Sequence, residues 1–231
     1  MVKIDEVRLM LFSAIEIVGK ENLFKQRKYP QGGGMLRITP EITDTIGWGI
    51  LDYGELKKFG GFVANTCHNE IREITLPFFI KHGFMGKSAK IKDWVPSFHP
   101  PQGIPIKNLN DLGFRNIEEI EFLKEVYVDF FVNEAIPHYK KWSSLLSVYD
   151  YVKNINEDKD AGLGQFPQYE KAVIMRLCND SRYKEYFYNY VLEKEYYYKT
   201  APNEDTLAHL NAANEMAGIL DKIQPKYNLL T

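Results

Sequence analysis

The hydrophobic residues of the first twenty positions recur at spacings of three and four. This spacing places them along one side of a helix, and polar residues occupy most of the positions between them. The stripe consists of Ile4, Val7, Leu11, Ile15 and Val18. The segment is therefore predicted to form an amphipathic helix with one buried face, which Gly19 helps to end.

The pattern is interrupted between Tyr29 and Gly34, where Pro30 is followed by three glycines within four positions. Glycine adds backbone freedom and proline lacks an amide donor, so this segment predicts a flexible loop and no regular element.

From Ile42 the apolar positions follow a period of two, which is typical of a strand with one buried face. Tyr53-Gly54 marks a turn, and residues 59–65 form a second extended run. The two runs predict an antiparallel hairpin over residues 42–65 whose face bearing Ile46, Trp48 and Ile50 packs on the N-terminal helix.

A helix is expected after the hairpin, beginning near Thr66 or Asn69 and ending before Gly83, with Pro77 either kinking it or opening a new turn. Residues 86–116 contain four prolines, with Trp94 and Phe98 between them. So long a stretch without periodicity is typical of a lid or binding loop, and an irregular connector pinned by aromatic residues is an equal alternative.

From Ile117 onward the pattern is helical. The first stripe runs from Ile117 to Phe131 and ends near Pro137. Four further helices are predicted from residues that favour helix starts: Ser143 or Ser144, then Pro167, then Asp180 or Ser181, and finally Asn203. The sequence thus predicts an α+β fold in one compact domain over residues 1–231, with a possible division into an α+β part (1–116) and a helical part (117–231).

Composition and cysteine content agree with an ordinary globular protein. Hydrophobic residues make up 45% and charged residues 26% of the 231 positions. The two cysteines, Cys67 and Cys178, have no second pair with which to form a disulfide framework or a zinc knuckle. No apolar run reaches the roughly 18–20 residues that span a bilayer. We expect a soluble, cytoplasmic protein that does not bind membranes.

Charge is unevenly distributed although the net charge is only −2. Residues 1–116 contain 16 basic and 12 acidic residues, and residues 117–231 contain 13 and 19. The only basic cluster, Lys25, Arg27 and Lys28, is more typical of a solvated turn than of a phosphate-binding patch. Because nucleic-acid binders show a concentrated basic stripe, no nucleic-acid partner is expected.

Candidate catalytic residues are few and do not form a complete motif. Cys67, His68 and Glu70 are sequence neighbours, but adjacent side chains on a strand or helix diverge, so helix capping is the simpler interpretation. Asp44 and Asp52 resemble an acid–base pair, yet we expect both to face solvent on the hairpin.

Phosphate-binding, metal and cofactor sites are not predicted. Gly86-Lys87-Ser88 lacks the upstream glycine of a phosphate-binding loop, because that position is Lys81. The histidines show no metal-ligand spacing, so neither a metal nor a cofactor is expected.

Tyrosine is the unusual feature of the C-terminal half. Tyr183, Phe187 and Tyr190 share a helix face that packs inward, whereas Tyr188, Tyr196, Tyr197 and Tyr198 have no obvious core to fill. Tyrosine is enriched at protein interfaces, so these four residues, with Trp94 and Phe98, are the predicted binding residues. Packing in the core is the alternative interpretation.

Two segments carry a resemblance to known proteins: Ile46-Gly47-Trp48-Gly49 in the hairpin, and residues 135–142 (Ala-Ile-Pro-His-Tyr-Lys-Lys-Trp) leading into Ser144-Leu145. They resemble small bacterial families of unknown function in which a twisted antiparallel sheet precedes a helix, an Ile-Pro-aromatic kink and further helices. Such families are similar in size and style to the immunity proteins of bacterial toxin systems. The resemblance implies a protein that works by binding, and the long helical C-terminus departs from it.

Two functions therefore stay open. The first is a protein-binding module without a catalytic site, either immunity- or antitoxin-like or homo-oligomeric, which uses aromatic and acidic surface of the C-terminal half. The alternative is a small hydrolase that uses Asp44 and Asp52, or His68 and Glu70, beneath the Pro-rich loop of residues 86–116.

Overall fold

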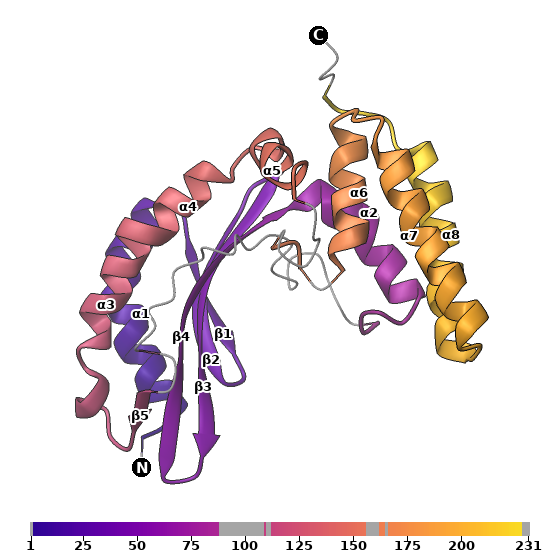
Figure 1. The fold of residues 1–231 in the computed structure, drawn as a ribbon. Helices are drawn as coiled ribbons and strands as arrows, with labels where there is room; N and C mark the ends of the chain where they lie inside the picture. The colour runs from indigo at the N-terminus through magenta and orange to yellow at the C-terminus, as the bar shows by residue number, and fades with distance from the viewer. Residues whose placement is uncertain (1, 88–108, 110–111, 156–161, 165, 228–231) are drawn as a thin grey trace. The chain divides into compact units, whose positions relative to one another are not determined.

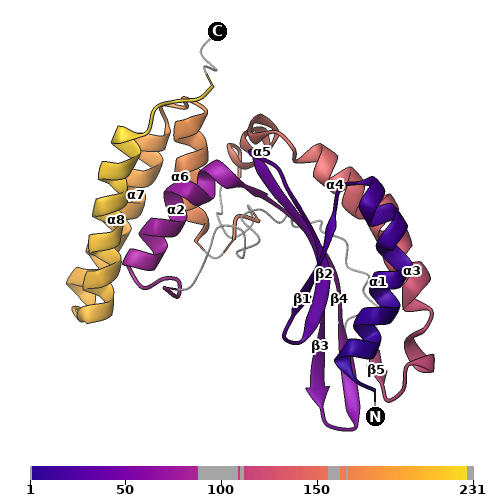
Figure 2. The ribbon, with the colours of Figure 1, turned by 180° about the vertical axis from the view of Figure 1, so that it is seen from behind.

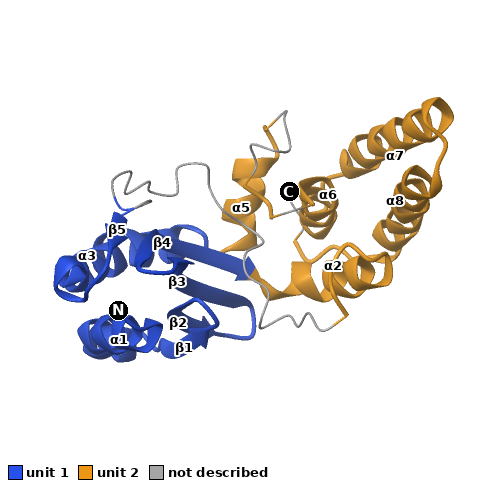
Figure 3. Ribbon diagram, turned by 90° about the horizontal axis from the view of Figure 1, so that it is seen from below, with its two compact units in different colours: residues 1–67, 102–143 blue, residues 68–101, 144–231 orange. Residues whose placement is uncertain are grey.

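The computed structural model describes residues 2–87, 109, 112–155, 162–164 and 166–227, and has an α+β fold. The described chain divides into two compact units, each assembled from two segments (Figure 3). Unit 1 comprises residues 1–67 and 102–143, and unit 2 comprises residues 68–101 and 144–231. Each unit therefore contains residues from both sides of the predicted division at residue 116.

Unit 1 contains a five-stranded antiparallel sheet in which the strands lie in sequence order, β1-β2-β3-β4-β5. Helix α1 and the later helices of this unit lie next to each other on one face of the sheet (Figures 1 and 2). The elements of the unit are α1 (Ile4–Glu21), β1 (Lys25–Tyr29), β2 (Gly32–Ile38), β3 (Ile42–Tyr53), β4 (Leu56–His68), β5 (Leu112–Phe114), the 3-10 turn η2 (Glu118–Ile120), α3 (Leu123–Phe130), the π-helical turn η3 (Phe131–Ala135) and α4 (Ile136–Lys141).

The predicted N-terminal helix and hairpin are both confirmed. Val7, Leu11 and Ile15 are fully buried in one core cluster with Ile46, Trp48 and Ile50 of β3. The ring of Trp48 lies 6.3 Å from that of Phe12, measured between centroids, so the predicted face of the hairpin packs on α1.

The expected loop at residues 29–34 is wrong, because Gly32, Gly33 and Gly34 begin strand β2. The absence of side chains is what allows this pairing. A Cβ atom on Gly34 would lie 2.3 Å from the carbonyl oxygen of Ile46 on β3. The glycines thus permit a close approach of two strands, and the basic residues before them lie on the edge strand β1, where lysine discourages further strand pairing.

The helical stripe that starts near Ile117 does not end at Pro137. Instead α3 continues through the π-helical turn η3 into α4, and Pro137 lies in the first turn of α4. Proline has no amide donor and clashes with the carbonyl four residues earlier, so the wider turn accommodates it. The bond from the Ile136 amide to the Phe131 carbonyl closes this turn.

Unit 2 is built around α6 (Pro167–Leu177), which contacts every other helix of the unit. The others are α2 (Asn69–Lys81), α5 (Leu145–Val152), α7 (Tyr183–Thr200) and α8 (Glu204–Lys222). Tyr169 of α6 is fully buried, and its ring contacts those of Phe78 and Phe79 from α2 and Phe187 from α7.

Several predicted helix boundaries are confirmed in unit 2. The hydroxyl of Ser144 accepts a hydrogen bond from the Leu146 amide at the start of α5. Pro167 occupies the first turn of α6, and Asn203 caps α8 in a reciprocal pair with Thr206. The predicted cap of α7 by Asp180 or Ser181 is wrong, because Arg182 is the N-cap residue and makes no capping bond through its side chain; Asp180 instead accepts a hydrogen bond from the Arg182 amide in the preceding turn. Among the described helices none is long and apolar enough to cross a membrane.

Candidate protein-binding surface

Asp44 and Asp52 lie at opposite ends of β3, in different environments. The Asp44 side chain is fully buried, which corrects the expectation that it faces solvent. Its carboxylate accepts hydrogen bonds from Arg37 at 2.7 Å and from the Thr66 hydroxyl at 2.8 Å. Burial raises the pKa of Asp44, and the bonds from Arg37 and Thr66 oppose that rise. Because its partners come from β2 and β4, this carboxylate ties three strands together.

Asp52 is exposed beside the hairpin turn. It accepts hydrogen bonds from Lys57 at 2.7 Å and from the Gly54 amide at 3.0 Å, and the bond from Lys57 is the main reason that its pKa is lowered. The structure therefore does not bring Asp44 and Asp52 together as an acid–base pair. The hydrogen-bonding partners of each carboxylate explain its position by a structural role in the sheet.

His68 and Glu70 lie at the start of α2. His68 occupies the N-cap position, is buried, and makes no capping bond through its side chain. Glu70 forms an ion pair with Lys226. Cys67, the residue before His68, is buried, and neither it nor Cys178 forms a disulfide. Across the described residues no group of histidine, cysteine, aspartate and glutamate side chains could hold a metal ion.

Sequence reasoning missed a buried ion pair between two helices of unit 2. Nη1 of Arg72 on α2 lies 3.2 Å from Oε1 of Glu170 on α6, and both side chains are inaccessible to solvent. The signal was present in the sequence, since Glu170 precedes Val173, Ile174 and Leu177 by three, four and seven positions and so occupies the apolar stripe of α6. Burial raises the pKa of the Glu170 carboxyl to about 7, and Arg72 offsets only part of that rise.

This raised pKa predicts a pH dependence of stability. Between about pH 4.5 and 7 the folded chain retains a proton on Glu170 that the unfolded chain has lost. The contribution of Glu170 to the free energy of unfolding is thus largest below pH 4.5 and falls as the pH rises to 7, by on the order of 1–3 kcal/mol. Urea denaturation of the wild type and of Glu170→Gln over this range measures the difference. A difference that rises with pH, or stays constant, would show that the carboxyl is ionised throughout.

A basic concavity of about 270 Å³ lies against α6 and α7, lined in part by Lys153, Lys171 and Arg182. All three basic side chains already have partners within unit 2. Lys153 pairs with Asp150 at 2.6 Å, Lys171 donates to the Ile155 carbonyl at 2.6 Å, and Arg182 pairs with Asp180 at 2.7 Å. The arrangement is explained by contacts within the unit and does not require an anion.

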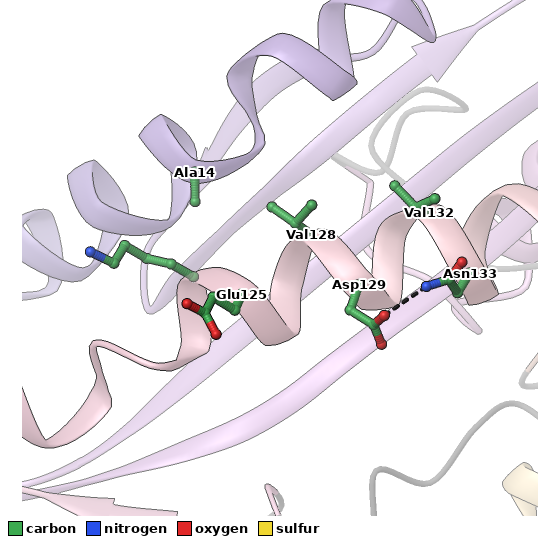
Figure 4. Close-up of a pocket in the computed structure, with 7 residues that line it drawn as sticks. Ala14, Glu125, Val128, Asp129, Val132 and Asn133 are labelled. Carbon is green, nitrogen blue, oxygen red and sulfur yellow. Dashed lines mark hydrogen bonds between the residues drawn. The ribbon is translucent and has the colours of Figure 1, made fainter.

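Unit 1 contains a shallow groove of about 580 Å³ between α1 and α3. Figure 4 shows Ala14 on α1 and the valines Val128 and Val132 along the other wall. Asp129 accepts a hydrogen bond from Asn133 at 2.6 Å across one turn. None of the described residues that line this groove is aromatic, so the described lining has little of the chemistry that dominates protein interfaces.

The predicted binding tyrosines lie on α7. Tyr188 and Tyr196 are 61% and 63% exposed, and Leu192, midway between them, is 41% exposed. Residues four apart share a helix face, so the three side chains form a continuous stripe, here called the α7 stripe. Tyr197 is also exposed and Tyr198 is half-buried. Trp94 and Phe98 lie outside the residues that the structure describes, as does most of the predicted loop over residues 86–116.

The inward face of α7 agrees with the sequence analysis. Tyr183 and Phe187 are buried, and the Tyr190 ring lies 5.4 Å from that of Tyr169 in the core of unit 2. The helix therefore uses one set of aromatic residues for its own packing and exposes another. Core packing accounts for the first set and leaves the exposed stripe unexplained.

A groove of about 630 Å³ runs between α7 and α8 beside the stripe. The two helices follow each other as a helical hairpin and lie side by side (Figures 1 and 3). Tyr188 belongs to both the α7 stripe and the groove, whose apolar floor includes Val191, Ala217 and Leu220. Glu185, Glu195 and Asp221 add three carboxylates to its lining, against one lysine, Lys184. We call the stripe and the groove together the α7–α8 face.

Comparison with known proteins gives no relative from which to assign a function. No family model matches the sequence, and neither the curated proteins nor the solved structures include a significant match.

Proposed function

We propose that this chain works by binding another protein through the α7–α8 face. The observation that carries the proposal is the α7 stripe, in which two tyrosines and a leucine are exposed in a row beside an apolar groove. Exposing these rings costs free energy that a partner recovers on binding, and tyrosine offers much contact area at a modest loss of conformational entropy. The described part of unit 2 has its own core without these side chains.

The class of partner follows from charge. The C-terminal half carries an excess of acidic residues, and three carboxylates line the groove. An acidic surface accelerates the encounter with a basic protein. Together with the resemblance of residues 46–49 and 135–142 to immunity-like bacterial families, this favours an immunity or antitoxin role toward a basic partner protein. We place that role in the bacterial cytoplasm, which agrees with two cysteines that form no disulfide.

The proposal predicts that removing the exposed rings weakens binding without unfolding the chain. Tyr188→Ser combined with Tyr196→Ser is expected to reduce the affinity for a captured partner by tenfold or more, because exposed aromatic residues at an interface centre each contribute over about 1 kcal/mol. Titration of the purified partner, followed by calorimetry, measures the loss.

The matched control is Tyr53→Ser, since Tyr53 is also 61% exposed but lies in the hairpin of unit 1. Its affinity for the partner is expected to equal that of the wild type. Circular dichroism should be unchanged in all variants, because exposed substitutions shift stability by about 0.5 kcal/mol or less. Equal binding by the double variant and the wild type would place the interface elsewhere.

A further inference from the structure

We infer that the groove of the α7–α8 face receives a basic amphipathic helix of the partner. The inference rests on the proposed function and adds the shape and the charge pattern of the bound segment. Three features of the groove carry it: its direction between two helices, its length, and the position of its carboxylates.

The groove suits a helix because it runs between two neighbouring helices of a hairpin. A third helix laid along such a groove packs its own ridges of side chains between theirs, which is the common mode of helix recognition. The apolar floor combines Phe187 with the smaller side chains of Val191, Ala217 and Leu220, against which apolar residues of a partner helix can pack. Tyr188, exposed at the edge, can cover the apolar side of such a helix.

The length of the groove sets the length of the bound segment. Its lining on α7 extends from Tyr183 to Glu195. The twelve residue-to-residue steps from Tyr183 to Glu195 span roughly 18 Å at 1.5 Å per residue. The occupant is thus a segment of about three turns, with large apolar residues at spacings of three and four.

The positions of the carboxylates predict where the partner helix carries basic residues. Glu185 and Asp221 mark one end of the groove, and Asp221 is placed there by a hydrogen bond of 3.2 Å from the Tyr183 hydroxyl. Glu195 marks the other end, roughly 15 Å along α7 from Glu185. A matching helix therefore carries lysine or arginine at two positions about ten residues apart, flanking its apolar side.

Glu185 also lines the basic concavity that contains Lys153, Lys171 and Arg182, but each of these cations has a partner within unit 2, so the acidic pattern of the groove remains. Lys184 is the one basic residue among the described lining residues. Lys199 approaches Glu195 only at 3.6 Å on the exposed side of the helix. Arg176 lies over the Tyr183 ring and donates to the Leu220 carbonyl, so its guanidinium is committed to the end of α8.

A synthetic helix tests the inference directly. The probe is an 18-residue amphipathic peptide with leucines at helical spacing and lysines about ten positions apart, labelled for fluorescence anisotropy. Its counterpart has glutamate in place of each lysine. We expect the basic peptide to bind the full chain at least tenfold more tightly than the acidic one at low salt, with the difference shrinking as salt is added.

Variants of the full chain assign the effect to the groove. A triple variant that combines Glu185→Gln, Glu195→Gln and Asp221→Asn should bind the basic peptide roughly tenfold more weakly, since each charge at the rim contributes modestly to the binding free energy. The control removes the same charge from exposed residues of unit 1, with Glu41→Gln, Glu55→Gln and Glu118→Gln combined. It should bind as the wild type does.

The outcomes separate this inference from the proposed function. Equal loss in both triple variants, equal binding of the two peptides, or no binding of either would overturn the basic helix. A natural partner that depends on Tyr188 and Tyr196 but tolerates loss of the three carboxylates would also overturn it, while the proposed function would stand. Loss of peptide binding in Tyr188→Ser, with the unit 1 controls unaffected, supports both.

Discussion

Replacement of Arg72 by methionine is expected to lower the free energy of unfolding by roughly 3–5 kcal/mol at pH 8. The substitution removes the cation that lowers the pKa of Glu170, so at pH 8 the variant must either bury an uncompensated carboxylate or protonate it on folding. Removing one partner of a buried ion pair is among the most destabilising changes in a protein. Urea denaturation followed by circular dichroism at 222 nm reports on the helices that this pair connects.

Replacing both partners should recover most of that loss. In Arg72→Met combined with Glu170→Met, two apolar side chains of similar length fill the space between α2 and α6, and no charge stays in the core. Pairs replaced in this way are often as stable as the original. We expect the double variant to lie within about 1–2 kcal/mol of the wild type.

A surface ion pair provides the control. Lys199 pairs with Glu195 at 3.6 Å and is 75% exposed, so Lys199→Met should change stability by less than about 0.5 kcal/mol. If Arg72→Met costs no more than Lys199→Met, then Arg72 and Glu170 do not form a buried ion pair. At pH 5, where Glu170 holds its proton in the folded chain, the cost of Arg72→Met should be smaller than at pH 8.

Gly34→Ala is expected to destabilise unit 1 by about 3 kcal/mol. The new methyl carbon would lie 2.3 Å from the Ile46 carbonyl oxygen and 3.0 Å from the Gly47 Cα atom. Both are backbone atoms of the neighbouring strand, so the contact can be relieved only by moving β2 and β3 apart. The midpoint of urea denaturation measures the effect.

Gly47 is the matched control because it is the residue opposite Gly34 in the ladder. A Cβ atom on Gly47 would meet nothing nearer than the Gly33 carbonyl oxygen, at 3.8 Å. Alanine at this position should be neutral or stabilise by up to about 1 kcal/mol, since glycine in a strand interior has excess conformational entropy to lose. Equal effects at positions 34 and 47 would contradict the close approach of the strands.

The accuracy of the sequence predictions depended on whether the decisive contacts were local. Helix α1 and the start of α8 were predicted because a helical stripe and a capping residue act within a few residues of each other. The glycines at 32–34 were assigned to a loop because a strand held by close backbone approach leaves no alternation of side chains to detect.

The other differences between the predicted and the observed structure arise from contacts between residues that are far apart in the sequence. The burial of Asp44 depends on Thr66, 22 residues later and on another strand, so the pattern around position 44 could not reveal it. The sequence predicts a helix end near Pro137, because the π-helical turn that accommodates this proline has no sequence signature of its own. In contrast, the exposure of Tyr188 and Tyr196 followed from their positions off the buried face of α7.

The most direct test of the α7–α8 face is amide hydrogen exchange on the chain alone and in complex with its captured partner. Slowed exchange on binding should concentrate in residues 183–196 of α7 and 214–221 of α8, because a partner seated on the groove excludes water and opposes local opening of these helices. Helix α1 and strands β1 to β5 should exchange at unchanged rates. Protection in the sheet or between α1 and α3, with α7 and α8 unaffected, would contradict the account.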